Sequence, residues 1–301
     1  MKLEDYREIV ACLEGERVLY HYYPDRYAFL LLGWAAEAGA DLKMLRASRF
    51  NRLLQKPSVR ECLMSCGDAR VDPALFHDYW LQDTRQFVLG LDSWSHQQTS
   101  RSDAQSYNLV LQLNFSREHM QDVNARFGRT DLFNYNFHPV QNAGDKKRRE
   151  TLAWARIDLD FATDTALIEE VQSDWVSALH WALQHGWWVD DRKFSKEFLG
   201  VYCEEALGWV RHQWSDAMLA ATLQFIRLEL GISQIFYHTW EGGNLLKRLD
   251  GTLPPKSLYT KLPQRFCMTR TSDVPEFLFN DRRLRRLFRV RPDIEFYRFI
   301  A

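Results

Sequence analysis

Residues 151–172 constrain the fold of this chain more than any other segment. Between residues 151 and 161 small or apolar side chains alternate with polar ones, and Arg156 and Asp158 share the polar side. Successive side chains of a strand point to opposite faces, so this pattern predicts a strand with one buried and one solvated face. After a short turn, residues 166–172 read as a second strand. The two segments together predict a hairpin.

The first 83 residues read mainly as helical. Asp41 suits the N-cap of a helix, and Pro57 and Pro73 suit the first turns of two others. Apolar spacing and these signals predict helices at residues 4–13, 25–37 and 41–53, and from residues 57 and 73 onward. A short apolar segment at residues 18–23 predicts a strand.

The pattern changes near residue 83, which divides the chain into a helical N-terminal region (1–83) and a second domain (84–301). In the second domain a polar loop is expected at 93–106. Further strands are predicted at 86–91, 107–115, 232–238 and 266–269, and helices at 116–127, 173–185, 195–209, 215–230 and 240–249. Strands and helices in this order indicate the α+β class, with a mixed sheet flanked by helices.

Composition excludes several classes of protein. The 301 residues are 46% hydrophobic and 26% charged, which argues against disorder, and a net charge of -1 argues against electrostatic binding by the whole chain. The longest apolar run, residues 27–38, is shorter than the roughly 20 residues that span a bilayer. With no apolar signal core at the start and five scattered cysteines, the sequence predicts a cytoplasmic protein with reduced thiols.

The run from Arg282 to Arg291 contains six arginines and no acidic residue, whereas residues 151–216 contain twelve acidic and five basic residues. The arginines suggest a site for phosphate or nucleic acid. The alternative, which we favour, is a helix that docks through Leu284, Leu287 and Phe288, with its arginines solvated or paired to the acidic region. Nucleic acid therefore ranks last among the expected partners.

Polar residues gather where the second hairpin strand meets the next helix. Glu170, Gln172 and Asp174 lie at this junction, and ligand sites favour the carboxyl ends of strands. Ser173 as N-cap and Asp174 near the helix dipole explain part of the pattern without a ligand. That explanation leaves out Glu170 and Gln172.

Strict alternation along this strand makes a specific prediction about its faces. It places Ile168, Glu170 and Gln172 on one side, and Glu169 and Val171 on the other. Asp158 and Asp160 on the first strand also resemble an acidic pair for a metal ion, but we favour two solvated positions on the polar face.

A second strand-to-helix junction contains His238, Trp240 and Asn244. His238 is suited to act as a general base near neutral pH, although a histidine at a strand end is more often structural. If the strands ending at Gln172 and His238 are parallel neighbours, both junctions open on the same edge of the sheet. Gln172, Asp174, His238 and Asn244 then approach one cleft.

Two segments are similar to known families. Residues 167–175 read LIEEVQSDW and resemble a Glu-x-Gln-Ser-Asp-Trp element in domains of large polyvalent proteins of phages and mobile elements, a resemblance that implies no activity. The order of elements in the second half is similar to the GNAT acyltransferase superfamily. Asn244 and residues 258–262, LYTKL, resemble that superfamily's late Asn and Leu-Tyr-x-Lys-Leu pattern. The resemblance implies that the strands ending at Gln172 and His238 hold an acyl donor such as acetyl-CoA, and that Tyr259 protonates the departing thiolate.

One departure from the superfamily decides between two functions. Its glycine-rich pyrophosphate loop is missing after Gln172, where residues 172–177 contain no glycine and Asp174 would repel a pyrophosphate. We therefore expect a GNAT-like protein that has lost this loop and serves in binding or interaction. The alternative is an acyltransferase or derived enzyme that acts in the cleft between the two junctions. In that enzyme Glu170 or His238 is the base and Tyr259 the acid, and the substrate contacts are Gln172, Asp174, Trp240 and Asn244. The sequence specifies no metal site and no partner.

Overall fold

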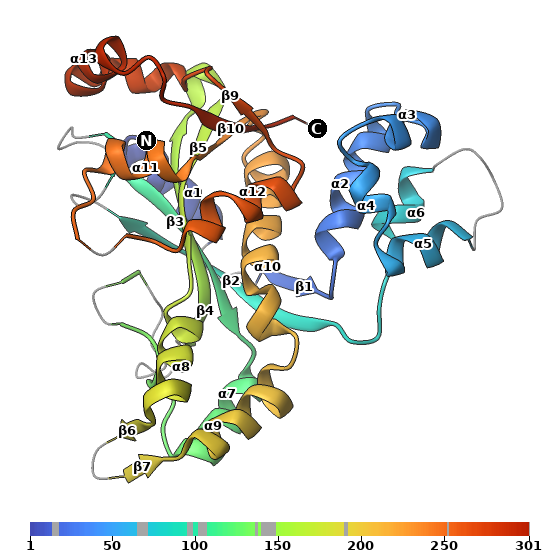
Figure 1. The fold of residues 1–301 in the computed structure, drawn as a ribbon, viewed down its shortest axis with the longest axis vertical. Helices are drawn as coiled ribbons and strands as arrows, with labels where there is room; N and C mark the ends of the chain where they lie inside the picture. Colours follow the sequence, from blue (N-terminus) through green and yellow to red (C-terminus); the bar gives the residue numbers. More distant parts are fainter. Residues whose placement is uncertain are drawn as a thin grey trace.

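An eight-stranded mixed sheet forms the centre of the computed structural model, which describes residues 1–13, 18–64, 72–94, 99–101, 107–135, 138–139, 149–189, 192–251 and 253–300 (Figure 1). The strands follow the order β1-β2-β3-β4-β5-β8-β10-β9. They are β1 (Leu19–Tyr22), β2 (Arg85–Trp94), β3 (Asn108–Phe115), β4 (Thr151–Asp160), β5 (Thr165–Gln172), β8 (Gln234–His238), β9 (Thr269–Thr271) and β10 (Phe296–Phe299). The α+β class is confirmed.

The predicted hairpin is present as β4 and β5, which pair antiparallel from Trp154 opposite Gln172 to Asp160 opposite Thr165. The strands β5 and β8 pair in parallel, as the cleft hypothesis requires. All other neighbours in the sheet are antiparallel. Because β5 and β8 are parallel, Gln172 and His238 both lie at carboxyl ends on the same edge.

Helices line both faces of the sheet. On one face α10 (Val210–Gln224) contacts β3, β4 and β5, and α8 (Asp174–His185) contacts β4. On the other face an apolar cluster joins Leu167, Phe236 and Phe296 of the sheet to α11 (Trp240–Lys247) and α13 (Arg282–Val290). The sheet is therefore the middle layer between these two sets of helices (Figure 1).

The N-terminal helices gather beside α10 and β1 (Figure 1). They are α2 (Arg26–Glu37), α3 (Leu42–Ala47), α4 (Asn51–Leu54), α5 (Pro57–Met64) and α6 (Pro73–His77). The first helix, α1 (Leu3–Leu13), lies apart from this group, near the sheet. Asp41 caps α3 as predicted, accepting a hydrogen bond from the backbone N–H of Met44. The single helix expected over 41–53 is wrong, because the backbone leaves the helical region at Ser48 (ψ 178°). Stacking of Tyr27 on Phe266, with ring centroids 4.8 Å apart, joins α2 to the segment that follows α12 (Lys261–Arg265).

Other predicted boundaries in the second domain also differ from the structure. The helix expected at 215–230 begins at Val210 and ends in a π-helical turn at Phe225–Glu229, and α9 (Lys196–Tyr202) continues into a second π-helical turn at Cys203–Leu207. The strand expected at 266–269 is wrong for most of its length, since α12 (Lys261–Arg265) ends there and β9 begins at Thr269. The helices and strands without a prediction include β10, α12 and the small hairpin of β6 (Trp187–Val189) and β7 (Arg192–Phe194).

The loop predicted at 93–106 is correct only in part, because β2 continues to Trp94. Residues 95–98 and 102–106 of that loop lie outside the described residues. Helix α7 (Arg117–Phe127) follows β3, and Ser116 caps it by accepting from the backbone N–H of His119. None of the helices that the structure describes has both the length and the apolar character needed to cross a membrane.

The half-solvated strand predicted at 151–161 is wrong in its burial. Arg156 is 1% exposed and Asp158 is fully buried. Arg101 binds both carboxylate oxygens of Asp158, at 2.7 and 2.6 Å, and the α-amino nitrogen of Met1 lies 2.7 Å from Oδ1. Asp158 is therefore a paired internal charge and not a solvated position.

The arginine run forms α13, and Leu284 and Phe288 are buried in the apolar cluster, so the predicted docking is confirmed. Two arginines of this run have partners other than the acidic segment that the sequence predicted. Arg283 donates to the carbonyls of Ser100 and Leu246, and Arg291 pairs with Asp293. No ion pair between this helix and the acidic segment 151–216 occurs among the residues that the structure describes.

His119 of α7 is partly buried against β3 and α9. Its ring stacks on Phe115 with centroids 4.1 Å apart, and Nε2 lies 3.2 Å from the hydroxyl of Tyr202. Burial lowers the pKa of His119 to about 4. The folded protein therefore holds this imidazole neutral at pH 7.

This burial predicts a loss of stability in acid. An unfolded chain protonates His119 below about pH 6.5, whereas the folded chain does so only near pH 4. The free energy of unfolding should fall by about 1–2 kcal/mol between pH 7 and 5 through this group. We expect His119→Gln to flatten the profile in urea denaturation over this range, and the exposed His180→Gln to leave it unchanged. A His119→Gln profile that parallels wild type would contradict the assignment.

Candidate functional site

A β-bulge in β5 turns the acidic residues of the first junction toward one side of the sheet. Arg156 pairs with Glu170 and the next residue, Ile157, pairs with Ile168, so Glu169 is the extra residue. A bulge interrupts the alternation of side chains along its strand. The prediction that Ile168 shares a face with Glu170 and Gln172 is therefore wrong.

The two faces after this correction differ sharply in chemistry. Ile168 and Val171 join the apolar core on the α10 side. The face of β3, β4 and β5 turned away from α10 is called the polar face below. It carries Asn108, Gln112, Trp154, Arg156, Asp158, Glu170 and Gln172. Buried polar groups are costly, so such a face indicates a functional role more than a role in folding.

Glu169 forms a buried cluster with the second junction. Its Oε2 lies 3.1 Å from Nε2 of His238 and 2.9 Å from the hydroxyl of Ser100, and its Oε1 accepts from the backbone N–H of Ser100 at 3.2 Å. Burial alone would raise the pKa of Glu169, but His238, Arg156 and Lys247 outweigh it and hold the pKa at about 2. Burial lowers the pKa of His238, against the attraction of Glu169.

The Ser100, His238 and Glu169 side chains do not form a nucleophilic triad. A triad uses one ring nitrogen of histidine for the hydroxyl and the other for the carboxylate. Here Nε2 of His238 contacts both partners, and Nδ1 has no hydrogen-bond partner within the described part of the chain. His238 is also fully buried, so a substrate does not reach it in this structure. The predicted base role of His238 stays a prediction.

Glu170 lies in a second cluster, with two cations and the predicted acid. Its Oε2 is 2.8 Å from Nη2 of Arg156 and 3.9 Å from Nζ of Lys247. Lys247 also contacts the hydroxyl of Tyr259 at 3.4 Å and lies over its ring, 5.4 Å from the centroid. Burial raises the pKa of the Tyr259 hydroxyl well above its usual value and lowers that of Lys247. The structure thus brings together Glu170 and Tyr259, the predicted base and acid, through Lys247.

Lys247 closes the gap at which β5 and β8 separate. The two strands pair only from Thr165 opposite Gln234 to Ile168 opposite Tyr237. From Glu169 onward, β5 pairs with β4 but no longer with β8. Nζ of Lys247, from α11, donates to the carbonyl oxygen of Glu169 at 3.0 Å. The lysine side chain is 1% exposed. It occupies the end of the strand pair that the GNAT resemblance assigns to an acyl donor.

Gln172 and Asp174 form a third cluster with a residue that the sequence did not single out, His138. The Asp174 carboxylate is fully buried, and its Oδ1 lies 2.7 Å from Nδ1 of His138 and accepts from Nε2 of Gln172 at 2.9 Å. The imidazole packs edge-on against Trp154, and Trp94 stacks on Trp154 with centroids 6.2 Å apart. A buried carboxylate on Nδ1 fixes the orientation and tautomer of an imidazole.

Trp240 and Asn244 lie apart from the Gln172 cluster. The indole of Trp240 donates to the carbonyl of Pro254 at 3.1 Å, and Lys256 lies over its ring. Nδ2 of Asn244 is buried without a partner among the described residues. The adjacent Gly243 lets α11 approach β8 closely, because a Cβ there would lie 3.0 Å from Cβ of His238.

Sequence reasoning found the acids of the site but missed its cations and aromatic residues. The sequence predicted Arg156 on a solvated face. Lys247 lies in a predicted helix, but no motif around it indicates a functional role. His138 falls in a segment that reads as a loop. Within the described residues no group of three or more His, Cys, Asp or Glu is arranged to hold a metal ion.

Comparison of the chain with protein-family models, with curated proteins and with solved structures gave no significant match.

The gap-closing role of Lys247 can be tested by a double-mutant cycle. Lys247→Met removes a buried cation and leaves the carbonyl of Glu169 without its donor, so we expect a loss of about 3 kcal/mol in the free energy of unfolding. Glu170→Gln in the same background should cost less than it does in wild type, because the two side chains interact. Urea denaturation measures the free energy of unfolding of each variant, which gives both the loss for Lys247→Met and its coupling to Glu170. Lys256→Met, which breaks an exposed pair with Glu241, is the matched control and should have little effect. Additive losses for Lys247 and Glu170 would contradict the coupling.

Proposed function

We propose that this chain is a ligand-binding protein with a GNAT-like sheet that does not use coenzyme A. Its ligand contacts the polar face at Glu170, Gln172 and His138. The observation that carries the proposal is the position of Lys247, whose amino group fills the gap between β5 and β8.

The order of elements supports the GNAT-like part of the proposal. The resemblance implies a hairpin, then helices, then a strand parallel to the second strand of the hairpin. The chain has β4 and β5, then α8 to α10, then β8 in parallel with β5. The parallel pair separates at its carboxyl end, after Ile168 and Tyr237.

Three observations argue against coenzyme A in this gap. The amino group of Lys247 hydrogen-bonds the β5 backbone, which an acyl donor would need to approach. Ser173 begins α8 as an N-cap, directly after β5, without a glycine turn. The carboxylate of Asp174 in the first turn of that helix repels a pyrophosphate.

The polar face presents hydrogen-bond acceptors to a ligand. Glu170 contacts both of its cations through Oε2, and its side chain is 16% exposed. The half-buried Gln172 uses its amide NH₂ as a donor to Asp174. The amide oxygen of Gln172 can then accept a hydrogen bond from a ligand. The carboxylate of Asp174 holds the His138 ring beside Gln172 through Nδ1. Acceptors beside the Trp94 ring suit a ligand that donates hydrogen bonds, such as an aromatic amine or alcohol.

Thermal unfolding and indole NMR together test this proposal. Acetyl-CoA and CoA should leave the Tm unchanged at millimolar concentration, because a ligand that does not bind the native state does not stabilise it. Tyramine, as an aromatic amine probe, should shift the indole resonances of Trp94 and Trp154, and Gln172→Ala should reduce that shift. A dose-dependent rise in Tm with acetyl-CoA that Tyr259→Phe and Gln172→Ala abolish would overturn the proposal in favour of the acyltransferase.

A derived enzyme is the second candidate, and the hydrogen bond between Asp174 and His138 favours it. A histidine whose Nδ1 is held by a buried carboxylate is arranged to take a proton at Nε2 from a bound amine or alcohol. This assigns the role of base to His138 in place of Glu170 or His238. The class of reaction is transfer or hydrolysis that begins with deprotonation of the nucleophile.

The tautomer of His138 provides a direct test of this alternative. Long-range ¹H–¹⁵N NMR of histidine-labelled protein should show His138 with its proton on Nδ1 at neutral pH. Asp174→Asn should reduce that preference, because an amide is a weaker acceptor than a carboxylate. His180 on the surface of α8 serves as the control and should not change. A proton on Nε2 of His138 in wild type would remove the base role.

A further inference from the structure

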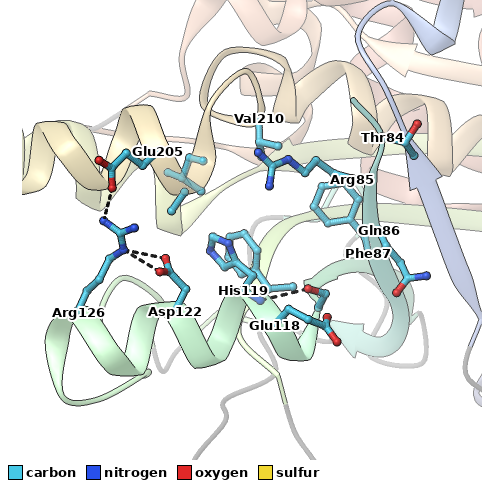
Figure 2. Close-up of a pocket in the computed structure, with 14 residues that line it drawn as sticks. Thr84, Arg85, Gln86, Phe87, Glu118, His119, Asp122, Arg126, Glu205 and Val210 are labelled. Carbon is cyan, nitrogen blue, oxygen red and sulfur yellow. Dashed lines mark hydrogen bonds and ion pairs between the residues drawn. The ribbon is translucent and has the colours of Figure 1, made fainter. Parts of the chain in front are cut away.

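A pocket with a cavity volume of about 310 Å³ lies on the opposite face of the sheet, away from the polar face. It is bounded by the start of β2, by α7 and by the π-helical turn Cys203–Leu207 (Figure 2). Its volume is at the lower end of the range for small-molecule sites, about 300–1,000 Å³. None of the residues assigned to the polar face lines it, so an inference here is independent of the proposed function.

Arg85 is a cation without a counter-charge in this pocket. Figure 2 shows its side chain reaching from β2 toward His119. Among the residues that the structure describes, no carboxylate pairs with Arg85, and its buried Nε has no hydrogen-bond partner. The side chain as a whole is half-buried, so its guanidinium can be reached by an anion that a ligand supplies, and such an anion would also pair the buried Nε.

Arg126, the other arginine that lines the pocket, is already paired with carboxylates. Arg126 binds both oxygens of Asp122, at 2.9 Å, and pairs with Glu205 at 3.0 Å. Figure 2 shows this group at the end of the pocket away from Arg85. His119 lies between the two arginines and is neutral at pH 7, because burial lowers its pKa. Among the described residues that line the pocket, Arg85 is therefore the cation that no carboxylate pairs with.

The carboxylates around the pocket limit the charge that such a ligand carries. Glu118, Asp122 and Glu205 all line it. They disfavour a dianion such as a phosphate monoester more than a carboxylate with one negative charge. The planar guanidinium of Arg85 also matches a carboxylate in a two-point hydrogen bond.

The remaining walls are apolar and flat. Phe87 and Phe115 belong to the core on the α10 side, and Leu207 and Val210 close the opposite wall. His119 stacks on Phe115 with an interplanar angle of 14°. These surfaces suit an aromatic or other planar apolar group attached to the carboxylate.

Gly208 lies next to Arg85, in a left-handed backbone conformation that favours glycine. The π-helical turn ends at Gly208, with φ 53° and ψ −130°, a conformation that residues with a side chain rarely adopt. A Cβ at this position would lie 3.7 Å from Nη2 of Arg85. Turns of this kind within helices are frequent at functional sites.

We propose that this pocket binds a small aromatic or apolar monocarboxylate, with Arg85 holding the carboxylate and Phe87, Phe115 and Val210 enclosing the apolar group. Neither the sequence reasoning nor the proposed function assigns a site here.

Calorimetric titration of the full chain at pH 7 with phenylacetate, phenylacetamide and phenyl phosphate tests the proposal. Phenylacetate should bind saturably, and the neutral amide of the same shape should bind at least about tenfold more weakly, because it forms no charged pair with Arg85. Phenyl phosphate should also bind more weakly. Arg85→Gln should weaken phenylacetate by a similar factor, whereas Arg46→Gln, on the exposed surface of α3, should not.

Each opposite result overturns the proposal. These results are no saturable binding of phenylacetate, equal binding of the acid and the amide, phosphate binding as tight as that of the carboxylate, or wild-type affinity in Arg85→Gln. If Arg85→Gln does not fold, the comparison of acid with amide on the wild-type protein decides alone. Tyramine binding at the polar face does not depend on these outcomes, so the two sites can fail separately.

Discussion

The contact between Lys247 and β5 is the interaction on which the central part of the structure depends. At this point the parallel strands separate, and their backbone groups would otherwise lose their partners inside the protein. The lysine supplies a donor to the carbonyl of Glu169 and a charge beside Glu170. Arg156 supplies the second cation, so the buried Glu169 and the partly exposed Glu170 meet two buried bases. Removing one member of such a set is costly, because the others remain charged without solvent.

The two faces of the sheet then divide the chemistry of the molecule. Among the described residues, the face toward α10 is apolar across its centre, and Arg85 lies at its margin, where β2 begins. The other face is apolar near β8 and β10 but polar over β3 to β5. There Gln112 donates to the carbonyl of Pro139 at 2.6 Å, so a loop outside the sheet supplies a hydrogen-bond partner to this buried polar side chain. Rigid strands thus carry the side chains, while loop residues such as Ser100 and His138 complete the clusters.

The sequence was sufficient to predict the elements whose patterns are local. The alternation of β4, the turn into β5, the capping residues Asp41 and Ser173, and the docking face of α13 all follow from spacing and cap chemistry. Burial of the polar side of β4 could not be predicted, because alternation shows that two faces differ and not what covers them. The bulge at Glu169 leaves no glycine or proline signal, and a predicted assignment of faces failed at that residue. Lys247 and His138 acquire their roles only through contacts with residues far away in the chain.

The bulge also determines how this site tolerates change. Every side chain of β5 after Glu169 faces the side it does because one residue has been added to the strand. If Glu169 took a regular place in the alternation instead of forming a bulge, Glu170 and Gln172 would turn toward the apolar core, and the segment leading to Asp174 would rotate with them. The site is therefore set by the number of residues in β5 as much as by their identity. Over evolutionary time such a strand can accept many replacements at a fixed length, whereas one residue inserted between Glu170 and Gln172 would exchange the faces of the residues that follow it.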